Sequence, residues 1–285
     1  MLPPRQIAKN FLDFIGYSNL FLAAAVFCST LQGGFIFGHV KDQAIGFSIL
    51  NFVAAFFLYN LQRIYQSAYP TTDIRLLWYR KNKKWIFTFA VLFLMVFIEP
   101  IWYTFIMYKE GLIIYGACAL FSILYFLPPV NLRKTGYFKQ FYIALIWVMV
   151  CVVIPFMFEE NSFVKTRNFK KDEVLYVISQ FCFIAALCIP FDIRDIEKDR
   201  SEGTKSIPVL LGIRKSKYIA IALMLIYFIL SFFIETKNLT GVRALILVIG
   251  SAVIWFSRPD KHRYYYTFLA DGVIIMQTLL LYLLL

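Results

Sequence analysis

The chain has 285 residues, of which 60% are hydrophobic and only 16% are charged, and its mean hydropathy is +0.68. These values exclude an ordinary soluble globular protein, in which about a quarter of the residues are charged. The formal net charge of +12 does not require a nucleic-acid partner, because basic loops beside an anionic leaflet are usual in proteins that cross a membrane many times.

Apolar stretches recur along the whole chain, and a spanning helix needs about 20 such residues. Lipid-facing backbone must satisfy its own hydrogen bonds, so these stretches are predicted to be helices. The sequence therefore predicts an all-α integral membrane protein with nine transmembrane helices in a single polytopic domain, residues 1–285. The predicted spans are 17–38, 44–65, 85–108, 112–128, 141–158, 174–191, 218–234, 242–256 and 265–284.

Lysine and arginine are divided unevenly between the two predicted sides of the membrane. Of the 29 in the chain, 21 fall on the side that holds the amino terminus and 8 on the other. Cytoplasmic loops carry the excess of such residues. The amino terminus and the loop at 192–217 are therefore predicted to be cytoplasmic. With an odd number of helices, the carboxy terminus is predicted to lie on the opposite side.

The fourth predicted helix ends in the stretch LYFLPPVNLRKTGYFKQ. Tyr125 precedes two prolines there, and Arg133 and Lys134 follow them. On the predicted topology this segment is cytoplasmic. The two basic residues are explained equally well by the general bias of positive charge toward the cytoplasm and by a phosphate-binding site, so both alternatives stay open.

The sixth predicted helix leads into IPFDIRDIEKDRSEGTKSIPVLLG, which carries three aspartates, Asp192, Asp195 and Asp199. On a helix the three carboxylates share one stripe, while Arg194 and Lys198 share another. Like charges four residues apart repel each other by about a few tenths of a kcal/mol. We therefore expect a cation to offset this repulsion.

A hard divalent cation suits oxygen ligands, so Asp192, Asp195 and Asp199 are predicted to bind Mg²⁺, with Mn²⁺ as the alternative. Pro190, in the last turn of the preceding helix, is predicted to kink or fray that helix and to let the motif project into a cavity. The loop that follows contains Lys205 and is short, polar and basic, which suits contact with phosphate oxygens. An ordinary charged cytoplasmic loop is the alternative.

These two segments together resemble the UbiA superfamily of intramembrane prenyltransferases, which join an isoprenoid diphosphate to an aromatic or other lipophilic acceptor. The stretch DIRDIEKDRSEGTKSIPVLLG resembles the family's second aspartate motif and its trailing Lys-Ser/Thr-Leu/Ile-Pro element. The stretch YFLPPVNLRK resembles the family's Tyr-x-x-Pro-Pro-x-x-x-Lys/Arg junction. Residues 125–212 carry nearly all of the resemblance, with a weak echo at Asp271 and Gly272 in the last helix.

The resemblance implies a Mg²⁺-dependent enzyme that works inside the membrane. In such an enzyme metal ions grip the diphosphate, the allylic carbon–oxygen bond ionises, and the acceptor captures the carbocation. The resemblance implies metal-binding and catalytic roles for Asp192, Asp195 and Asp199. The candidate contacts for the diphosphate are Asn60, Arg63, Tyr125, Arg133, Lys134 and Lys205. The 31 Phe, 18 Tyr and 5 Trp side chains supply aromatic surface for the dry chamber that a carbocation needs.

The family's first aspartate motif is lost. It should fall at YNLQRIYQSAY, where Asn60 remains and where the three aspartate positions hold Leu61, Ile64 and Ala68. In one interpretation Arg63 replaces the missing metal with a planar fork for diphosphate, assisted from the following loop by Arg75, Arg80 and Lys83. In the other, the protein no longer catalyses transfer and instead binds a lipid or a partner helix.

The enzyme is the favoured interpretation, because three carboxylates beside a membrane are costly to keep without a cation. Two further acids have more than one reading. Asp73 is either a solvated loop residue or an acid relocated to the site. Glu99 either caps the kink made by Pro100 or faces the central cavity as a base for the acceptor.

Overall fold

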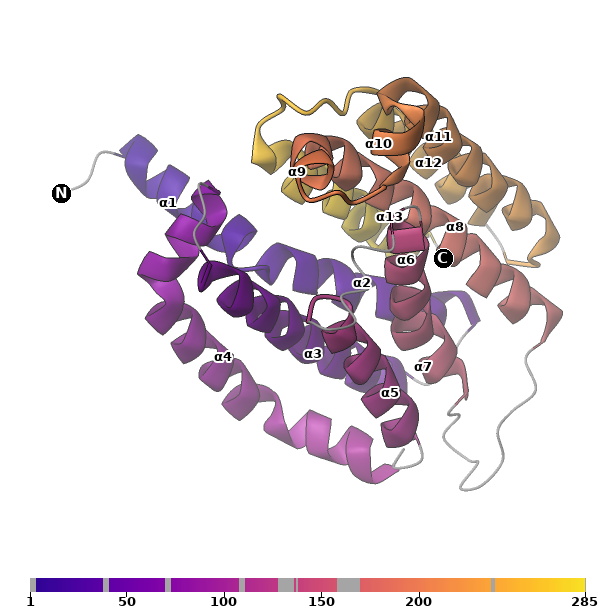
Figure 1. Cartoon of the computed structure of the whole chain (residues 1–285). Helices are drawn as coiled ribbons and strands as arrows, with labels where there is room; N and C mark the ends of the chain where they lie inside the picture. The colour runs from indigo at the N-terminus through magenta and orange to yellow at the C-terminus, as the bar shows by residue number, and fades with distance from the viewer. Residues whose placement is uncertain are drawn as a thin grey trace.

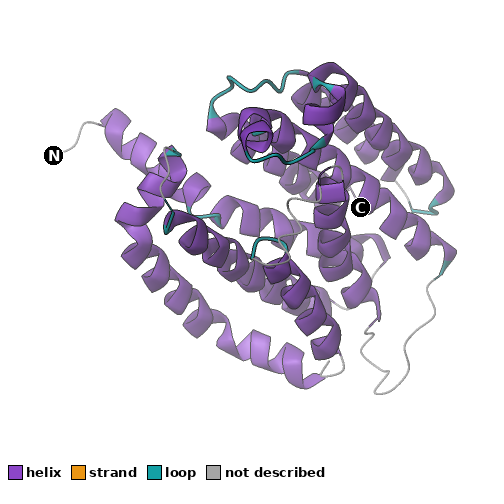
Figure 2. Ribbon diagram, viewed as in Figure 1, coloured by secondary structure: helices purple, strands orange, loops and turns teal. Residues whose placement is uncertain are grey.

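Helices make up nearly all of the structure. The computed structural model describes residues 4–37, 41–69, 73–107, 111–127, 136, 138–157, 170–236 and 239–284. Most residues in these ranges are helical, a few form loops and turns, and none lies in a β-strand (Figures 1 and 2). The prediction of an all-α protein is confirmed.

The described elements are α-helices with three short π- or 3₁₀-helical turns among them. In chain order they are α1 (Pro4–Tyr17), α2 (Leu20–Phe37), α3 (Lys41–Ser67), α4 (Ile74–Met107), α5 (Gly111–Leu124), α6 (Lys139–Val148), η2 (Met149–Val153), α7 (Ile154–Met157), α8 (Lys171–Arg194), α9 (Ile196–Ser201), α10 (Ile207–Leu211), α11 (Ile213–Ile229), η3 (Leu230–Phe233), α12 (Leu239–Trp255), η4 (Tyr265–Ala270) and α13 (Asp271–Leu284). Two of these, η2 and η4, are π-helical turns that run directly into the next helix.

Seven helices of the described chain are long and apolar enough to cross a membrane. They cover Leu20–Phe37, Gln43–Ser67, Ile74–Thr104, Lys139–Met157, Lys171–Arg194, Ile213–Phe233 and Tyr265–Leu284. The spans predicted at 112–128 and 242–256 coincide with two shorter apolar helices, Ile113–Leu124 and Leu239–Trp255. The protein is thus a multi-pass integral membrane protein, while the count of nine stays a prediction.

Two local predictions are wrong. The loop expected to follow the second span is largely helical, because α4 begins at Ile74 and carries Arg75, Arg80 and Lys83 on its first turns. At Pro190 the expected fraying is also wrong, because α8 continues to Arg194, whereas Asp192 and Asp195 do line a cavity, as expected. A proline removes only one backbone hydrogen bond, and neighbouring helices hold a membrane helix together across such a gap.

The centre of the bundle is α8. It packs against α6 on one side and α11 on the other, while α2 packs against α3 and α13 (Figure 1). Its apolar residues Phe183, Ala186 and Ile189 have no exposed surface. In the most apolar stretch of α8, 61% of the residues are buried, whereas in that of α4 only 17% are buried. The helix that carries the aspartates is therefore an inner helix, and α4 presents most of its surface to lipid.

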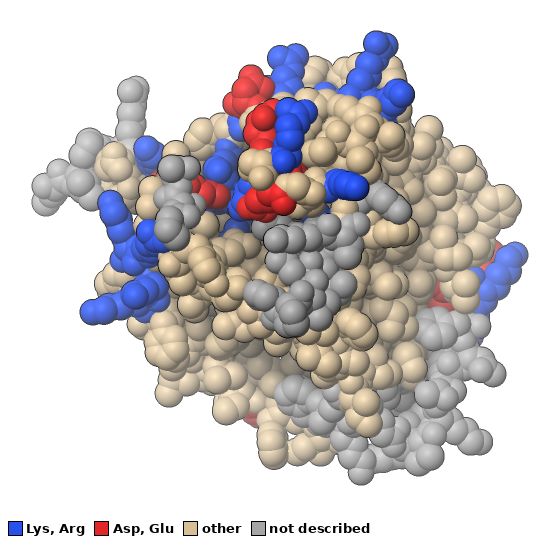
Figure 3. Space-filling model, in the orientation of Figure 1, with Lys and Arg blue, Asp and Glu red and all other residues tan. Residues whose placement is uncertain are grey.

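Charged side chains gather at one end of the molecule. In Figure 3 most of the Lys, Arg, Asp and Glu side chains on the visible face lie around α9 and the neighbouring helix ends, and most of the rest of that face is uncharged. A band free of charge is what contact with hydrocarbon requires. The aspartate segment thus lies at the boundary between the apolar body and the polar end.

The close packing of α2 on α3 depends on a glycine. A Cβ atom added at Gly34 would lie 2.6 Å from the Cβ of Ala44, which belongs to the rigid backbone frame of α3. At Gly116 in α5, by contrast, an added Cβ would meet nothing within 4 Å.

We predict that Gly34→Ala lowers the melting temperature of the purified protein in detergent, while Gly116→Ala does not. Both changes gain about 1 kcal/mol of helix propensity, but only the first forces two helices apart, at an overpacking cost of about 1–3 kcal/mol. Thermal unfolding of the two variants and the wild type, followed by circular dichroism, measures the difference. Equal melting temperatures for the two variants would contradict the close contact.

Candidate active site

The segment after α8 is not one continuous helix. α8 ends at Arg194, Asp195 adopts a non-helical conformation with φ −92° and ψ 12°, and α9 then runs from Ile196 to Ser201. The chain turns back when the Thr204 amide donates to the Asp199 carbonyl at 2.8 Å, and Gly203 has a φ of +71° that favours glycine. The helix is thus interrupted at Asp195, and the three carboxylates divide between two cationic partners.

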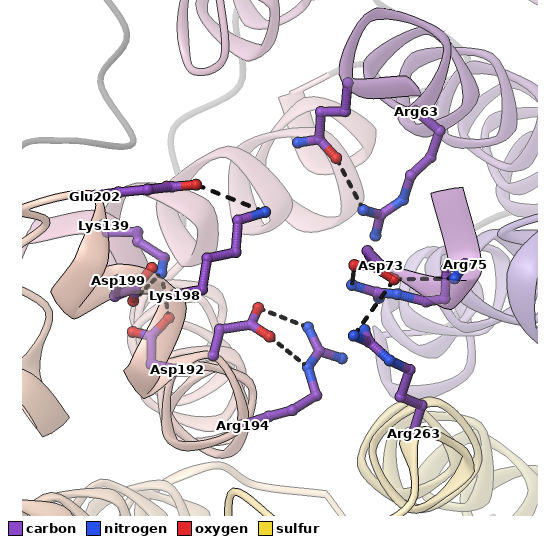
Figure 4. Close-up of polar contacts among 12 residues, drawn as sticks. Arg63, Asp73, Arg75, Lys139, Asp192, Arg194, Lys198, Asp199, Glu202 and Arg263 are labelled. Carbon is purple, nitrogen blue, oxygen red and sulfur yellow. Dashed lines mark hydrogen bonds and ion pairs between the residues drawn. The ribbon is translucent and has the colours of Figure 1, made fainter. Parts of the chain in front are cut away.

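Lys139 joins two of the three aspartates (Figure 4). Its Nζ lies 2.7 Å from Oδ1 of Asp192 and 2.9 Å from Oδ2 of Asp199, which are lengths of charge-assisted hydrogen bonds. The three side chains are 7%, 5% and 0% exposed. The cation expected to offset the carboxylate repulsion is thus supplied, in this pair, by the first residue of α6.

The third aspartate is held by its own neighbour. Arg194 donates from Nε and Nη2 to the two carboxylate oxygens of Asp195, both at 2.8 Å. Burial on its own would raise the pKa of Asp195, but Arg194 outweighs it and, with Arg75 and Lys139, holds the pKa well below its usual range. The Arg194 guanidinium also lies over the rings of Phe191 and Tyr266. Asp195 is therefore an ionised, anchored carboxylate.

A second ionic cluster forms where α4 begins. Asp73 accepts the backbone N–H of Arg75 at 2.9 Å and pairs with the side chains of Arg75 at 3.4 Å and Arg263 at 3.3 Å. Its side chain is only 14% exposed, so the reading of Asp73 as a solvated residue is wrong. Burial on its own would raise the pKa of Asp73, but Arg75 and Arg263 outweigh it and keep the pKa below its ordinary value.

A polar cavity of about 190 Å³ lies between these two clusters. The cationic side chains that line it outnumber the carboxylates by five to three in the described part of the chain. The cations are Arg63, Arg75, Lys139, Arg194 and Lys198, and the carboxylates are Asp192, Asp195 and Asp271. Arg63, Arg75 and Arg194 extend into one region of the close-up from three different helices (Figure 4). The site is therefore suited to an anion.

The face of α3 that lines the cavity is not the face that carries the positions of the lost aspartate motif. Tyr59, Gln62, Arg63 and Gln66 line the cavity, at the spacing of one helix face. The three positions where the family motif would have aspartates, Leu61, Ile64 and Ala68, are all exposed and lie off this face. Arg63 donates to Gln66 Oε1 at 3.0 Å, which orients the guanidinium along the cavity wall.

An apolar cavity of about 150 Å³ adjoins the polar one. Five residues line both cavities, namely Tyr59, Gln62, Tyr125, Ile143 and Trp147. The Trp147 indole N–H donates to the Tyr59 hydroxyl at 3.0 Å, and the ring of Tyr125 stacks on that of Tyr142 at 5.8 Å. The π-helical turn η2 contributes Val150 and Cys151 to the apolar wall. The two cavities together therefore form a charged compartment joined to an apolar one.

The other predicted site residues lie apart from the cavities or outside the described residues. The Asn60 amide donates to the Ser18 and Phe56 carbonyls and accepts from Asn19, so it ties α3 to the junction of α1 and α2. Lys205 is exposed and is not among the cavity-lining residues. Glu99 is exposed on α4 and lines neither cavity. Arg133 and Lys134 fall outside the described residues.

The two segments that carry the family resemblance do meet in space. Gly136, at a φ of +80°, packs so closely on Lys205 that an added Cβ would lie 2.8 Å from the Lys205 carbonyl oxygen. Three residues further along, Lys139 reaches Asp192 and Asp199. Gly136, just before α6, and Lys205, in the loop after α9, are therefore in contact close to the Lys139 ion pairs.

The arrangement does not fit a bound divalent cation. Among the described residues there is no group of three or more His, Cys, Asp or Glu side chains placed to hold a metal ion. The oxygens such an ion would use already bind Lys139 and Arg194. Asp192 Oδ2 is a buried carboxylate oxygen without a hydrogen-bond partner in the described chain, but one such oxygen is far fewer than the ligands a divalent cation takes. The Mg²⁺ and Mn²⁺ predictions therefore gain no ligand set from this geometry.

The sequence alone did not single out Lys139 or the cavity position of Asp271. The one available signal for Lys139 was a lone cation directly before an apolar span, on the same predicted side as the aspartates. Asp271 follows the π-helical turn η4, is 6% exposed, and lines the polar cavity with Thr267 of that turn. Its pattern in the sequence was only an Asp-Gly pair within an apolar helix.

Comparison with known families gives one match. The profile of the UbiA prenyltransferase family matches residues 80–265, which is more than half of the chain. This range includes Tyr125, Lys139, the aspartate segment and most of the cationic cavity lining. No curated protein and no solved structure matches the chain.

We predict that Asp73→Asn lowers the melting temperature at pH 7 and that the difference from wild type shrinks progressively as the pH falls below about 4. A depressed pKa means that the ionised carboxylate stabilises the fold above its unfolded-state value, and that this stabilisation is lost as Asp73 becomes protonated. Thermal unfolding across this pH range tests the expectation. The exposed Glu197, paired with Arg200 at the surface, provides a matched Glu197→Gln control with little expected effect.

Proposed function

Because the chain belongs to the UbiA prenyltransferase family, we propose that it is an intramembrane prenyltransferase. It would transfer an isoprenoid from its diphosphate to a lipophilic acceptor of the aromatic or quinone-precursor class. The observation that carries this proposal is the junction of a cationic cavity with an apolar one across a shared wall. An isoprenoid diphosphate has the matching shape, with an anionic head on a hydrocarbon tail.

The cationic cavity suits the diphosphate. Guanidinium groups offer planar pairs of N–H donors that match phosphate oxygens, and they remain charged when partly buried. Arg63, Arg75 and Arg194 supply three such groups from α3, α4 and α8. The buried Nε of Arg75 has no hydrogen-bond partner in the described chain, so one donor is available to a ligand. The bias of basic residues supports a cytoplasmic location for this cavity.

The apolar cavity suits the isoprenoid tail and the reacting carbon. In the transfer the allylic carbon–oxygen bond breaks and its electron pair leaves with the diphosphate. The carbocation then bonds to an electron pair of the acceptor, and the acceptor loses a proton. Aromatic ring faces stabilise such a cation, and Tyr59, Tyr125 and Trp147 form the wall between the two cavities.

Two residue types complete the chemistry. The cavity cations stabilise the negative charge that develops on the departing diphosphate, which is commonly the largest contribution in reactions of this kind. Asp271 lines the same cavity, and the described residues provide no salt-bridge partner for it. It is therefore the carboxylate best suited to accept the proton from the acceptor. No step in this scheme passes through a metal ion.

A protein that binds the same ligand without turnover is the second candidate. The observation that favours it is the α3 face, where the positions of the lost aspartates are apolar and exposed. Both candidates require diphosphate binding, and only the enzyme releases diphosphate. Incubation of the protein in proteoliposomes with radiolabelled isoprenoid diphosphate and a lipid extract separates them, because binding without diphosphate release supports the second candidate.

We predict that Arg63→Ala weakens binding of an isoprenoid diphosphate by at least about tenfold, which corresponds to about 1.4 kcal/mol. The change removes one bidentate donor from the cavity without touching the aspartates. Isothermal titration calorimetry in detergent measures the affinity. Lys215→Ala removes the same charge from an exposed position and serves as the control. An unchanged affinity for Arg63→Ala would refute its role in diphosphate binding.

We predict that Ala119→Phe reduces the affinity for a 20-carbon isoprenoid diphosphate by about tenfold and leaves a 10-carbon one nearly unaffected. Ala119 lines the apolar cavity of about 150 Å³, and a phenyl ring there would fill much of the space for a longer tail. Ala252→Phe, at an exposed position on α12, is the matched control. Equal losses for both chain lengths would show that the tail does not enter this cavity.

A further inference from the structure

The Lys139 ammonium joins two carboxylates as a divalent cation would, but at hydrogen-bond distances and not at metal–oxygen ones. It brings together carboxylates from α8 and α9, at 2.7 Å from Asp192 and 2.9 Å from Asp199. A divalent cation at this point would do the same with its first-shell oxygens. The difference is that the ammonium is tethered by its side chain to the first turn of α6, so it does not exchange with ions in solution.

Displacement of this ammonium by a metal ion would be costly. All three side chains are at most 7% exposed, and separating a buried ion pair is strongly unfavourable because it leaves an uncompensated charge. Lys139 also lies at the amino-terminal end of a helix, where the helix dipole disfavours a cation. The two carboxylates therefore hold the lysine against that dipole, and neither charge is stable in place without the other.

A metal ion at this site would neutralise the carboxylates and would also bind the phosphate oxygens. The cations in the cavity can bind the phosphate oxygens in its place. Arg63, Arg75, Arg194 and Lys198 line the same cavity as Lys139 and Asp192. Arg194 and Arg75 lie beside anchored carboxylates, Asp195 and Asp73, that fix the direction of their guanidinium groups. The site is thus pre-charged and pre-oriented for an anionic head group by side chains alone.

We propose that Lys139 permanently replaces the divalent cation at Asp192 and Asp199, so that this chain binds isoprenoid diphosphate without a metal ion. This inference rests on the proposed function for the identity of the ligand. It assigns Lys139 a positioning role, since its ammonium fixes the two aspartates and the wall they form. The arginines, and not a magnesium bridge, hold the diphosphate.

The first test uses Mn²⁺ alone, with no diphosphate present. Electron paramagnetic resonance counts the Mn²⁺ bound to the wild type and to Lys139→Ala. We expect no stoichiometric uptake by the wild type and uptake of about one Mn²⁺ by Lys139→Ala, whose two carboxylates have lost their cation. The double variant Lys139→Ala/Asp192→Asn should lose this uptake. One Mn²⁺ bound by the wild type, or none bound by a folded Lys139→Ala, would overturn the replacement.

The second test uses isoprenoid diphosphate and the wild type, so it does not depend on whether a variant folds. Calorimetric affinities in excess EDTA and in excess Mg²⁺ should agree within about twofold. Loss of binding in EDTA would overturn metal-independent binding. Absence of binding under both conditions would instead count against the proposed function, while the Mn²⁺ comparison, which needs no diphosphate, still decides the role of Lys139.

Discussion

The buried ammonium of Lys139 between Asp192 and Asp199 is the constraint on which the polar end of this protein depends. A charge at this depth is tolerable only with a partner, because desolvation of an unpaired carboxylate or ammonium is very costly. The pairing fixes the start of α6 against the end of α8 and α9. It also leaves the turn at Asp195 free to direct that carboxylate to Arg194, whose guanidinium lines the cavity. The contact of Lys139 with Asp192 and Asp199 thus fixes the position of charged residues that line the polar cavity.

Hydropathy was a reliable guide to the bundle, because lipid imposes helices on every apolar span. It failed where the physical reason no longer applies. At Ile74 the helix α4 begins well before its apolar part, since a helix does not have to end where hydrocarbon ends. Pro190 was also a poor signal, because the packing of α8 on both sides outweighs one missing hydrogen bond.

Only some of the residues of the site could be predicted from the sequence. The family motifs pointed to the aspartates, and the lost first motif pointed to Arg63. The aspartates are ion-paired, and Arg63 lines the polar cavity. The partner of the aspartates could not be read in the same way, because Lys139 reaches them only through the packing of α6 on α8. Asn60 shows the opposite case. It aligns with a family motif, but its side-chain amide forms hydrogen bonds at the junction of α1 and α2. Spacing along one helix is local information, whereas a partner across helices is not.

The π-helical turns η2 and η4 lie beside the two cavities, one contributing Val150 and Cys151 and the other preceding Asp271. Such a turn holds one residue more than an α-helix would use over the same rise. Deleting a single residue there would convert the turn to regular α-helix and change which side chains the turn itself presents, while the helix on either side keeps its faces. A one-codon length change at η2 would therefore alter the side chains that this turn presents to the apolar cavity, and so change what the chamber accepts, while the rest of the helix keeps its packing.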